Sequence, residues 1–299
     1  MVEQYKPRRV TVLSRDELKQ SEMKVRWPND EVRFLLGDVR DYDRLRRAFQ
    51  GVDIVVHAAA LKQVPAAEAD PFEAVQTNIM GGKNVIEAAI DTGVTRVLAL
   101  STDKAVAPAN LYGATKLVAE KLFVQGNAYS GDSGTRLSCV RYGNVIGSRG
   151  SVIPVFMEQR KTGKISITDE RMTRFWISLQ MGVKFVIESL ERMRGGEIYV
   201  PKIPSMRIME LAEVVAPGCK IELVGIRPGE KLHEAMISAD ESSRTFEYEN
   251  FFMIKPANPL WPEEDWTGGT PVPEGFEYSS DANPSAMSGT ELAELIEGL

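Results

Sequence analysis

Short β-branched segments alternate with helical segments through the first half of the chain, and this alternation constrains the fold more than any other feature. The strand segments are apolar along almost their whole length, as burial on both faces of a sheet requires. Strands that alternate with helices at this spacing predict a parallel sheet with right-handed crossovers. We therefore expect an α/β fold with a Rossmann-like doubly wound parallel sheet. The expected strands cover residues 9–13, 32–36, 53–57, 94–100 and 136–141, and the expected helices cover residues 16–23, 41–49, 72–90 and 111–125.

The second half of the chain has a different pattern. After about Gly150, glycine, proline and charged turns become frequent and the helical segments become shorter. We therefore expect a Rossmann-like domain at residues 1–150 and a smaller part at residues 151–299 that crosses the carboxyl edge of the sheet. The stretch from Pro256 to Ser288 is rich in proline, glycine and glutamate and predicts an irregular tail.

Composition and charge exclude several classes of protein. The net charge of −6 over 299 residues argues against a general nucleic-acid binder, which needs a basic surface. Two unrelated cysteines, Cys139 and Cys219, predict no disulfide framework and fit a reducing cytoplasm. With two histidines and no CxxC or HxxxH pattern, we expect no metal site. No apolar run approaches the roughly 18 residues that span a bilayer, and the first residues do not resemble a signal peptide.

A polar cluster follows the apolar strand expected at residues 94–100. It reads Ser101-Thr102-Asp103-Lys104, and Tyr112 and Lys116 come shortly after it, four residues apart. Open α/β sheets bind ligands at the carboxyl ends of their strands, and an i, i+4 pair lies on one face of a helix. A lysine ammonium beside a phenol lowers the pKa of the tyrosine. Tyr112 is therefore a candidate general base for a substrate hydroxyl, with Lys116 as its partner.

The order of many motifs makes the chain similar to the inverting UDP-N-acetylglucosamine 4,6-dehydratases, which are extended short-chain dehydrogenases of polysaccharide biosynthesis. This resemblance covers nearly the whole chain. Its matching stretches are SRDELKQSEM (14–23), GDVRD (37–41), HAAALKQVP (57–65), TNIMG (77–81), STDKA (101–105), LYGATK (111–116), VRYGNVIGSRGSVIP (140–154), ITDERMTRFWI (167–177), VPKIPSM (200–206) and GIRPGEKLHE (225–234).

The resemblance implies an NADP-dependent dehydration that inverts C5 of UDP-N-acetylglucosamine. Tyr112 with Lys116 would remove the 4-OH proton, Lys104 would act as base at C5, and Asp103 would be the acid that helps the 6-OH leave. Retaining sugar dehydratases carry Asp-Glu where this chain has Asp103-Lys104. A lysine acts as a base when its pKa is depressed, and we expect burial beside Lys116 and the nicotinamide to depress that of Lys104.

The same resemblance gives residues 1–150 the role of an NADP-binding domain. Ser14, Arg15 and Lys19 suit a 2′-phosphate, because an arginine at this place favours NADP where an acidic residue favours NAD. Residues 142–145 are expected to border the nicotinamide. The full set of expected cofactor-binding residues is Ser14, Arg15, Lys19, Asp38, Val39, Ala58, Ala59, Ala60, Thr102, Tyr112, Lys116 and Val145.

Charged residues of the second half are candidates for binding the UDP-sugar substrate. Arginine forks suit phosphates, and a carboxylate can accept from ribose hydroxyls. By contrast, His57, Met172, Trp176 and the Phe251-Phe252 pair are interpreted as core residues. The expected substrate-binding residues are Lys62, Asn144, Arg174, Arg227 and Glu230.

The chain departs from the family at its beginning. Members of the family open with a strand, a glycine-rich turn and a helix, and the printed chain begins where their second strand is about to start. That turn grips a pyrophosphate with backbone N–H groups. We expect the missing strand to be central, between the strands starting near Arg9 and Val94, and its absence to weaken NADP binding and stability.

Two other functions stay open. A nucleotide-sugar 4-epimerase would share every feature except the C5 and C6 chemistry, for which Asp103-Lys104 would be superfluous. A non-catalytic Rossmann-like binding protein would need none of the four candidate catalytic residues. The resemblance also implies self-association, as dimers or hexamers.

Overall fold

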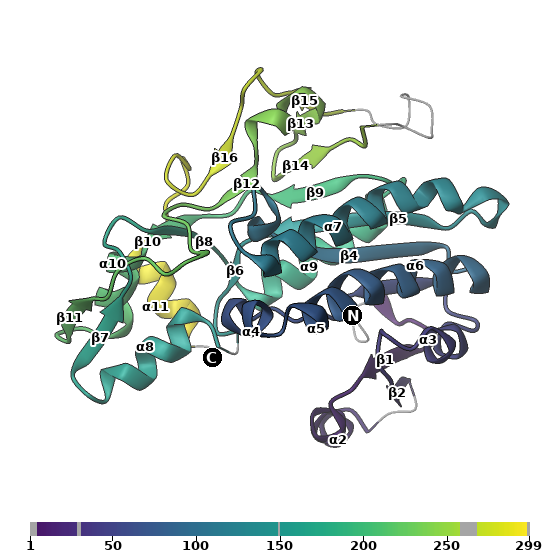
Figure 1. Cartoon of the computed structure of the whole chain (residues 1–299), viewed down its shortest axis with the longest axis horizontal. Coiled ribbons are helices and arrows are strands. Elements are labelled where there is room, and N and C mark those ends of the chain that lie inside the picture. Colours follow the sequence, from purple (N-terminus) through teal and green to yellow (C-terminus); the bar gives the residue numbers. More distant parts are fainter. Residues whose placement is uncertain (1–4, 29–30, 149, 258–267, 298–299) are drawn as a thin grey trace.

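A seven-stranded sheet forms the centre of the computed structural model, which describes residues 5–28, 31–148, 150–257 and 268–297 (Figure 1). The strand order is β15-β13-β14-β9-β5-β4-β3. The strands from β3 to β9 are parallel, and β14, β13 and β15 continue the sheet in antiparallel pairs. The α/β class with a largely parallel sheet is therefore confirmed. The strands are β3 (Ile54–His57), β4 (Arg96–Thr102), β5 (Arg136–Tyr142), β9 (Ile198–Pro201), β13 (Thr245–Glu247), β14 (Phe251–Ile254) and β15 (Thr270–Pro271).

Both faces of the parallel strands are buried, and this explains their continuous apolar sequences. Along β4, Val97 and Ala99 pack into one core cluster with the helices α6 and α7, whereas Leu98 packs into another with α9. Cys139 and Val140 of β5 divide in the same way, because successive side chains of a strand point to opposite faces. The helices are α6 (Gly81–Thr92), α7 (Leu111–Gly126) and α9 (Leu179–Arg192).

The expected long helix at residues 72–90 is longer than predicted and is interrupted. It consists of α5 (Pro71–Val75), a π-helical segment Gln76–Met80 and α6, in direct succession. A further short helix, α4 (Val64–Ala69), precedes it and was not expected. The π-helical segment matters for the site, because it places Asn78 between α7 and the loop after β3.

The strands β1 (Val10–Ser14) and β2 (Val32–Leu36) form a separate parallel pair. Among the described residues, β1 pairs only with β2, and β3 pairs only with β4. The gap in the sheet therefore lies between β1 and β3, and the expectation that it would adjoin the strand starting near Val94 is wrong. That strand, β4, is paired with β3 along this edge. Figure 1 shows the pair with its helices α2 (Glu17–Arg26) and α3 (Tyr42–Ala48), of which α3 packs against α6.

The rest of the second half forms a smaller part with its own core, in which Met172 and Trp176 are buried as expected. Phe252 is buried in the core of the main sheet, and Phe251 packs beside Tyr199. The sheet itself crosses the expected boundary near residue 150, since β9 and β13 to β15 come from residues 198–271. The remaining elements are β6 (Asn144–Val145), α8 (Val152–Arg160), β7 (Lys164–Ile167), β8 (Thr173–Ile177), β10 (Ser205–Arg207), α10 (Ile208–Val215), β11 (Lys220–Leu223), β12 (Ala235–Ile237), β16 (Tyr278–Ser279), α11 (Gly289–Glu297) and the 3₁₀ turns Asp103–Ala105, Asn127–Tyr129, Gly131–Ser133 and Ala239–Arg244.

Candidate active site

The start of helix α7 is held tightly against the turn that follows β4. The Asn110 side chain caps the helix by accepting from the Gly113 backbone N–H at 2.8 Å, and its amide donates to the Gly229 carbonyl at 2.8 Å. A Cβ at Gly113 would lie 2.2 Å from the Lys104 carbonyl oxygen. Only glycine at position 113 permits this approach, which brings Tyr112 beside the Asp103-Lys104 turn.

Asp103 and Lys104 form a partly enclosed acid–ammonium pair at the carboxyl end of β4. Lys104 Nζ donates to Asp103 Oδ1 at 3.1 Å, and Thr102 Oγ1 donates to the same oxygen at 2.8 Å. The Asp103 side chain is fully buried, whereas that of Lys104 is 23% exposed. Among the described residues, Asp103 Oδ2 has no hydrogen-bond partner. A buried carboxylate oxygen without a partner is costly in a purely structural role, and it is therefore a candidate for contact with a ligand.

Tyr112 is buried, and burial raises the pKa of its phenol. The Lys104 ammonium and a hydrogen bond with the Thr102 side chain act to lower this pKa, and Asp103 acts to raise it. The expectation that Lys116 would supply the cation is wrong for the structure as it stands. Lys116 Nζ donates to the Leu100 carbonyl at 2.6 Å, because the side chain extends toward the strand.

The expected depression of the Lys104 pKa is also contradicted. Burial does act to lower the pKa, but the carboxylates of Asp103 and Glu234 outweigh it and raise the pKa above its ordinary value, while Arg174 acts in the lowering direction. The expected neighbour, Lys116, instead has its own pKa lowered by burial. Glu234 was not singled out from the sequence, although it ends the GIRPGEKLHE stretch.

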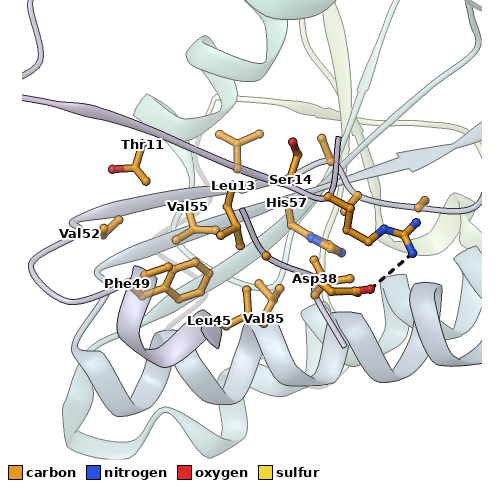
Figure 2. Close-up of a pocket in the computed structure, with 18 of the residues that line it drawn as sticks. Thr11, Leu13, Ser14, Asp38, Leu45, Phe49, Val52, Val55, His57 and Val85 are labelled. Atoms are coloured by element: carbon orange, nitrogen blue, oxygen red, sulfur yellow. Dashed lines mark hydrogen bonds and ion pairs between the residues drawn. The ribbon is translucent and has the colours of Figure 1, made fainter. Parts of the chain in front are cut away.

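A cavity of about 690 Å³ lies between the β1–β2 pair and the edge strand β3 (Figure 2). On the β1–β2 side of the cavity, Arg15 after β1 pairs with Asp38 after β2, with 3.4 Å between Nη1 and Oδ2. Eight of the expected cofactor-binding residues line this one cavity. They are Ser14, Arg15, Lys19, Asp38, Val39, Ala58, Ala59 and Ala60.

The other residues that line the cavity are mainly apolar. Figure 2 shows Leu13 of β1, Val55 of β3 and Phe49 after α3 around the same space. Ile54 and Val56 of β3 also line it and are 46% and 38% exposed. Apolar side chains of a parallel strand are normally covered on both faces, so Ile54 and Val56 leave an uncovered apolar surface at this end of the cavity.

Asp38 is fixed by a residue that the sequence did not indicate. Arg40 donates to Asp38 Oδ2 from Nε at 2.9 Å and from Nη2 at 2.7 Å, and it also pairs with Glu73. Burial acts to raise the pKa of Asp38, but its hydrogen bonds with Arg40 and the charges of Arg40 and Arg15 lower it overall. Asp38 is therefore held as a carboxylate at the rim of the cavity.

The other expected cofactor residues, Thr102, Tyr112, Lys116 and Val145, do not line this cavity. They lie near the carboxyl ends of β4 and β5. Asn78 connects them with the loop after β3, because it hydrogen-bonds both backbone groups of Leu61 and donates to Thr115 Oγ1 at 2.9 Å. The role of Asn78 was not predicted from the sequence, although Asn78 lies in the TNIMG stretch that matches the family.

Three of the expected substrate-binding residues, Arg174, Arg227 and Glu230, lie in the loop before β12 or bind to it. Arg174 donates to the backbone carbonyls of Leu232 and Lys231, at 2.9 Å each, and so shapes this loop. Glu230 Oε2 accepts from the Arg227 backbone N–H at 3.3 Å. Of the other two expected residues, Lys62 follows Leu61, and Asn144 begins β6.

The expected core role of His57 is confirmed. The ring is 5% exposed and stacks on Phe123 with 5.5 Å between ring centroids. Burial lowers the pKa of His57 to about 3, so the ring is neutral at physiological pH. No group of three or more metal-ligating side chains occurs within the described residues. In that same part of the chain, no helix combines the length and apolarity that a membrane crossing requires.

Comparison with known proteins places the chain in a family. Residues 1–256 match the model of a family described as polysaccharide biosynthesis protein. An inverting UDP-N-acetylglucosamine 4,6-dehydratase of Campylobacter jejuni subsp. jejuni serotype O:23/36 (strain 81-176) is 52% identical, over 99% of this chain and 91% of the relative. A UDP-glucose 4-epimerase of Rickettsia akari (strain Hartford) is 42% identical, over 82% of this chain and 73% of the relative.

Solved structures give the same fold. The X-ray structure of Pen from Bacillus thuringiensis superposes with a TM-score of 0.90 at 40% identity, covering 99% of this chain and 91% of that one. DesIV from Streptomyces venezuelae, a dTDP-glucose 4,6-dehydratase with NAD and TYD bound, superposes with a TM-score of 0.67 at 25% identity. That match covers 75% of this chain and 77% of DesIV.

Proposed function

The chain belongs to the polysaccharide biosynthesis protein family, and from that premise we propose that it dehydrates UDP-N-acetylglucosamine to a UDP-4-keto-6-deoxy sugar with inversion at C5. One observation carries the proposal. The Asp103-Lys104 pair, with its fully buried carboxylate, lies at the carboxyl end of a central strand beside Tyr112, so that two acid–base systems meet at one place. The similarity to the inverting dehydratase of Campylobacter jejuni supports the same reaction.

The cavity between β1 and β3 suits a nicotinamide dinucleotide, and we propose NADP. Arg15 is 52% exposed and its pairing with Asp38 is a long one at 3.4 Å, so its guanidinium can also meet a 2′-phosphate. Ala58, Ala59 and Ala60 line the cavity and have no bulky side chains to keep a ligand from their backbone. NADP bound there would supply hydride transfer from C4 and back to C6.

The side chains of the site would carry the protons. Tyr112 Oη accepts the proton of the 4-OH, and the resulting 4-keto group acidifies the C5 hydrogen. Lys104 Nζ removes the C5 proton, and Asp103 donates a proton to the 6-OH, which leaves as water. After hydride returns to C6, a proton would be added to C5 from the face opposite the one that lost it, which inverts C5. The sum is then the loss of one water molecule with no net oxidation, so no external reductant is needed. In the substrate complex, Arg174, Arg227, Glu230, Lys62 and Asn144 are proposed to hold the UDP-sugar.

A UDP-sugar 4-epimerase is the second candidate, supported by the similarity to the Rickettsia akari protein. An epimerase needs the Tyr112 chemistry alone. The buried Asp103-Lys104 pair, with its unpartnered carboxylate oxygen, favours dehydration. A non-catalytic binding protein would leave these buried charges without a purpose, although burying them is costly.

Product analysis distinguishes the candidates. The purified chain is incubated with UDP-N-acetylglucosamine and added NADP in deuterated water, and the nucleotide sugars are identified by mass spectrometry and NMR. We expect a product lighter than the substrate by one water, with solvent deuterium at C5. UDP-N-acetylgalactosamine as the product would establish the epimerase, and no turnover with retained ligand binding would favour the binding protein.

We propose that the product serves surface polysaccharide or flagellin glycan synthesis in the cytoplasm. Both cysteines are free thiols, as a reducing compartment favours.

We also propose self-association, because Phe72 of α5 and Val118 of α7 expose 84% and 42% of their surface on helices that contact each other. Light scattering on wild type and on F72E/V118E tests this, and identical masses for the two would contradict it.

A further inference from the structure

Glu234 is a buried carboxylate that lies immediately before β12 and faces the catalytic turn. Its side chain is 4% exposed, and its Oε1 lies 3.4 Å from Lys104 Nζ. Its other oxygen, Oε2, lies 3.8 Å from Lys231 Nζ and has no hydrogen-bond partner among the described residues. A carboxylate this deeply buried needs a nearby positive charge, and the closest one is Lys104.

The backbone of Glu234 is fixed independently of its side chain. Its N–H donates to Ser280 Oγ at 3.0 Å, and its carbonyl accepts from the Ser280 N–H at 2.8 Å. The neighbouring Lys231 is held by the Val106 carbonyl at 2.6 Å. The carboxylate is therefore presented to Lys104 by a rigid support, which is what orienting a catalytic group requires.

We propose that Glu234 is the positioning residue of Lys104, which it orients toward C5 and whose ammonium it stabilises once the C5 proton has been taken. This inference rests on the proposed dehydration. In the proposed step, the C5–H bond breaks, an N–H bond forms at Lys104 Nζ, and the electron pair passes through the C4 carbonyl and then expels the 6-OH, to which Asp103 gives a proton. Glu234 itself exchanges no proton.

The arrangement follows the logic of a base that is oriented by a third group. Asp103 cannot orient Lys104 and stabilise its ammonium alone, because Asp103 is the proposed acid and is uncharged before it donates its proton. During C5 deprotonation, Glu234 is then the carboxylate that remains beside Lys104. Glu234 thus explains how Lys104 can receive a proton in a buried site that also requires a protonated acid next to it.

The charge of Glu234 also sets the pH at which Lys104 becomes a base. The charged and titratable groups around Lys104 are Asp103, Glu234, Arg174 and Tyr112, with Lys231 on the far side of Glu234. An anion beside an ammonium raises the pKa of that ammonium. Replacing Glu234 by an uncharged residue therefore lowers the pKa of Lys104, and the neutral amine forms at lower pH.

The test compares wild type, E234Q and E234D, with E247Q as a matched control. Glu247 is half exposed and pairs with Lys202, away from the site. We expect E234Q to lose about 10- to 100-fold in kcat, as loss of an orienting carboxylate does at other sites, with KM within about threefold of wild type. The same loss is expected for solvent deuterium incorporation at C5, while hydride removal from C4, followed at 340 nm, continues.

Two pH profiles separate positioning from a merely structural role. kcat/KM is expected to rise with pH as Lys104 loses its proton. In E234Q this rise is expected at lower pH than in wild type. The rate of Lys104 acetylation by acetic anhydride, followed by mass spectrometry without substrate or cofactor, is expected to shift in the same direction. E234D keeps the charge on a shorter side chain. Both of its pH profiles are expected to rise at the same pH as in wild type, and its kcat is expected to lie between those of wild type and E234Q.

Unchanged kcat and unchanged pH profiles in E234Q would overturn the inference. If E234Q does not fold, E234D decides instead, because wild-type kcat in that variant would show that the placement of the carboxylate is unimportant. If wild type itself forms no 4-keto-6-deoxy product, the proposed function fails, and the acetylation profile still reports whether Glu234 controls the charge of Lys104.

Discussion

At the scale of single residues, the behaviour of the site depends on which cation acts on Tyr112. The i, i+4 spacing placed Lys116 on the expected helix face, yet its ammonium donates to the Leu100 carbonyl. Lys104 is the cation that acts to lower the pKa of Tyr112, against the larger effect of burial, which raises it. Side-chain spacing along a helix predicts a shared face, but it does not predict where a long side chain ends. That depends on the strand packed against it.

We predict that K104M moves the rising limb of hydride removal from C4 to higher pH. Loss of the ammonium removes an influence that lowers the pKa of Tyr112, so the phenolate forms only at higher pH. The measurement is reduced cofactor at 340 nm in a single turnover with UDP-N-acetylglucosamine across a pH series. K83M, which removes an exposed lysine that pairs with Glu87, is the control. An unshifted limb in K104M would show that Lys104 has no influence on Tyr112.

At the scale of elements, the predicted strands and helices agree with the structure to within a few residues, because their periodicity is local. The links between elements were not predictable in this way. Arg141 of β5, 1% exposed, is bound by Glu120 of α7 and by Glu241 of the 3₁₀ turn beside β12. These partners are 21 and 100 residues away, and each alone reads as an ordinary surface charge. This network connects the helix that carries Tyr112 with the strand next to Glu234.

We predict that E241Q lowers the free energy of unfolding at pH 7 by about 2 kcal/mol, as loss of a charged hydrogen bond does. Burial acts to raise the pKa of Glu241, but Arg141 lowers it overall below the ordinary 4.5. A group whose pKa is lowered by folding contributes stability above its unfolded pKa and loses it as the pH falls through the folded value. The difference between wild type and E241Q is therefore expected to be full above about pH 4.5 and to shrink below it. Urea unfolding at several pH values measures it, and a difference independent of pH would contradict the assignment.

At the scale of the whole molecule, two open strand edges face each other across the proposed cofactor cavity. We expected the gap in the sheet to adjoin the strand starting near Val94, because the periodicity of a strand does not show which other strand it pairs with. The structure places the gap between β1 and β3, where Ile54 and Val56 are left partly exposed. Nucleotide-binding residues line one end of the resulting cavity, so the stability of the sheet and the affinity for the cofactor depend on the same space.

We predict that fusing a strand, a glycine-rich turn and a helix of the family's pattern ahead of β1 raises both properties. The strand would satisfy the edges of β1 and β3, and covering Ile54 and Val56 alone is worth about 2 kcal/mol, or about 3 °C in Tm for a chain of this size. The turn would present backbone N–H groups to the pyrophosphate and increase the affinity for NADP. Calorimetry and fluorescence titration measure the two effects. A matched fusion with the turn glycines replaced by alanine is expected to keep the gain in Tm and to lose the gain in affinity. Equal Tm and equal cofactor affinity with and without the fused segment would show that the space between β1 and β3 does not accept a strand.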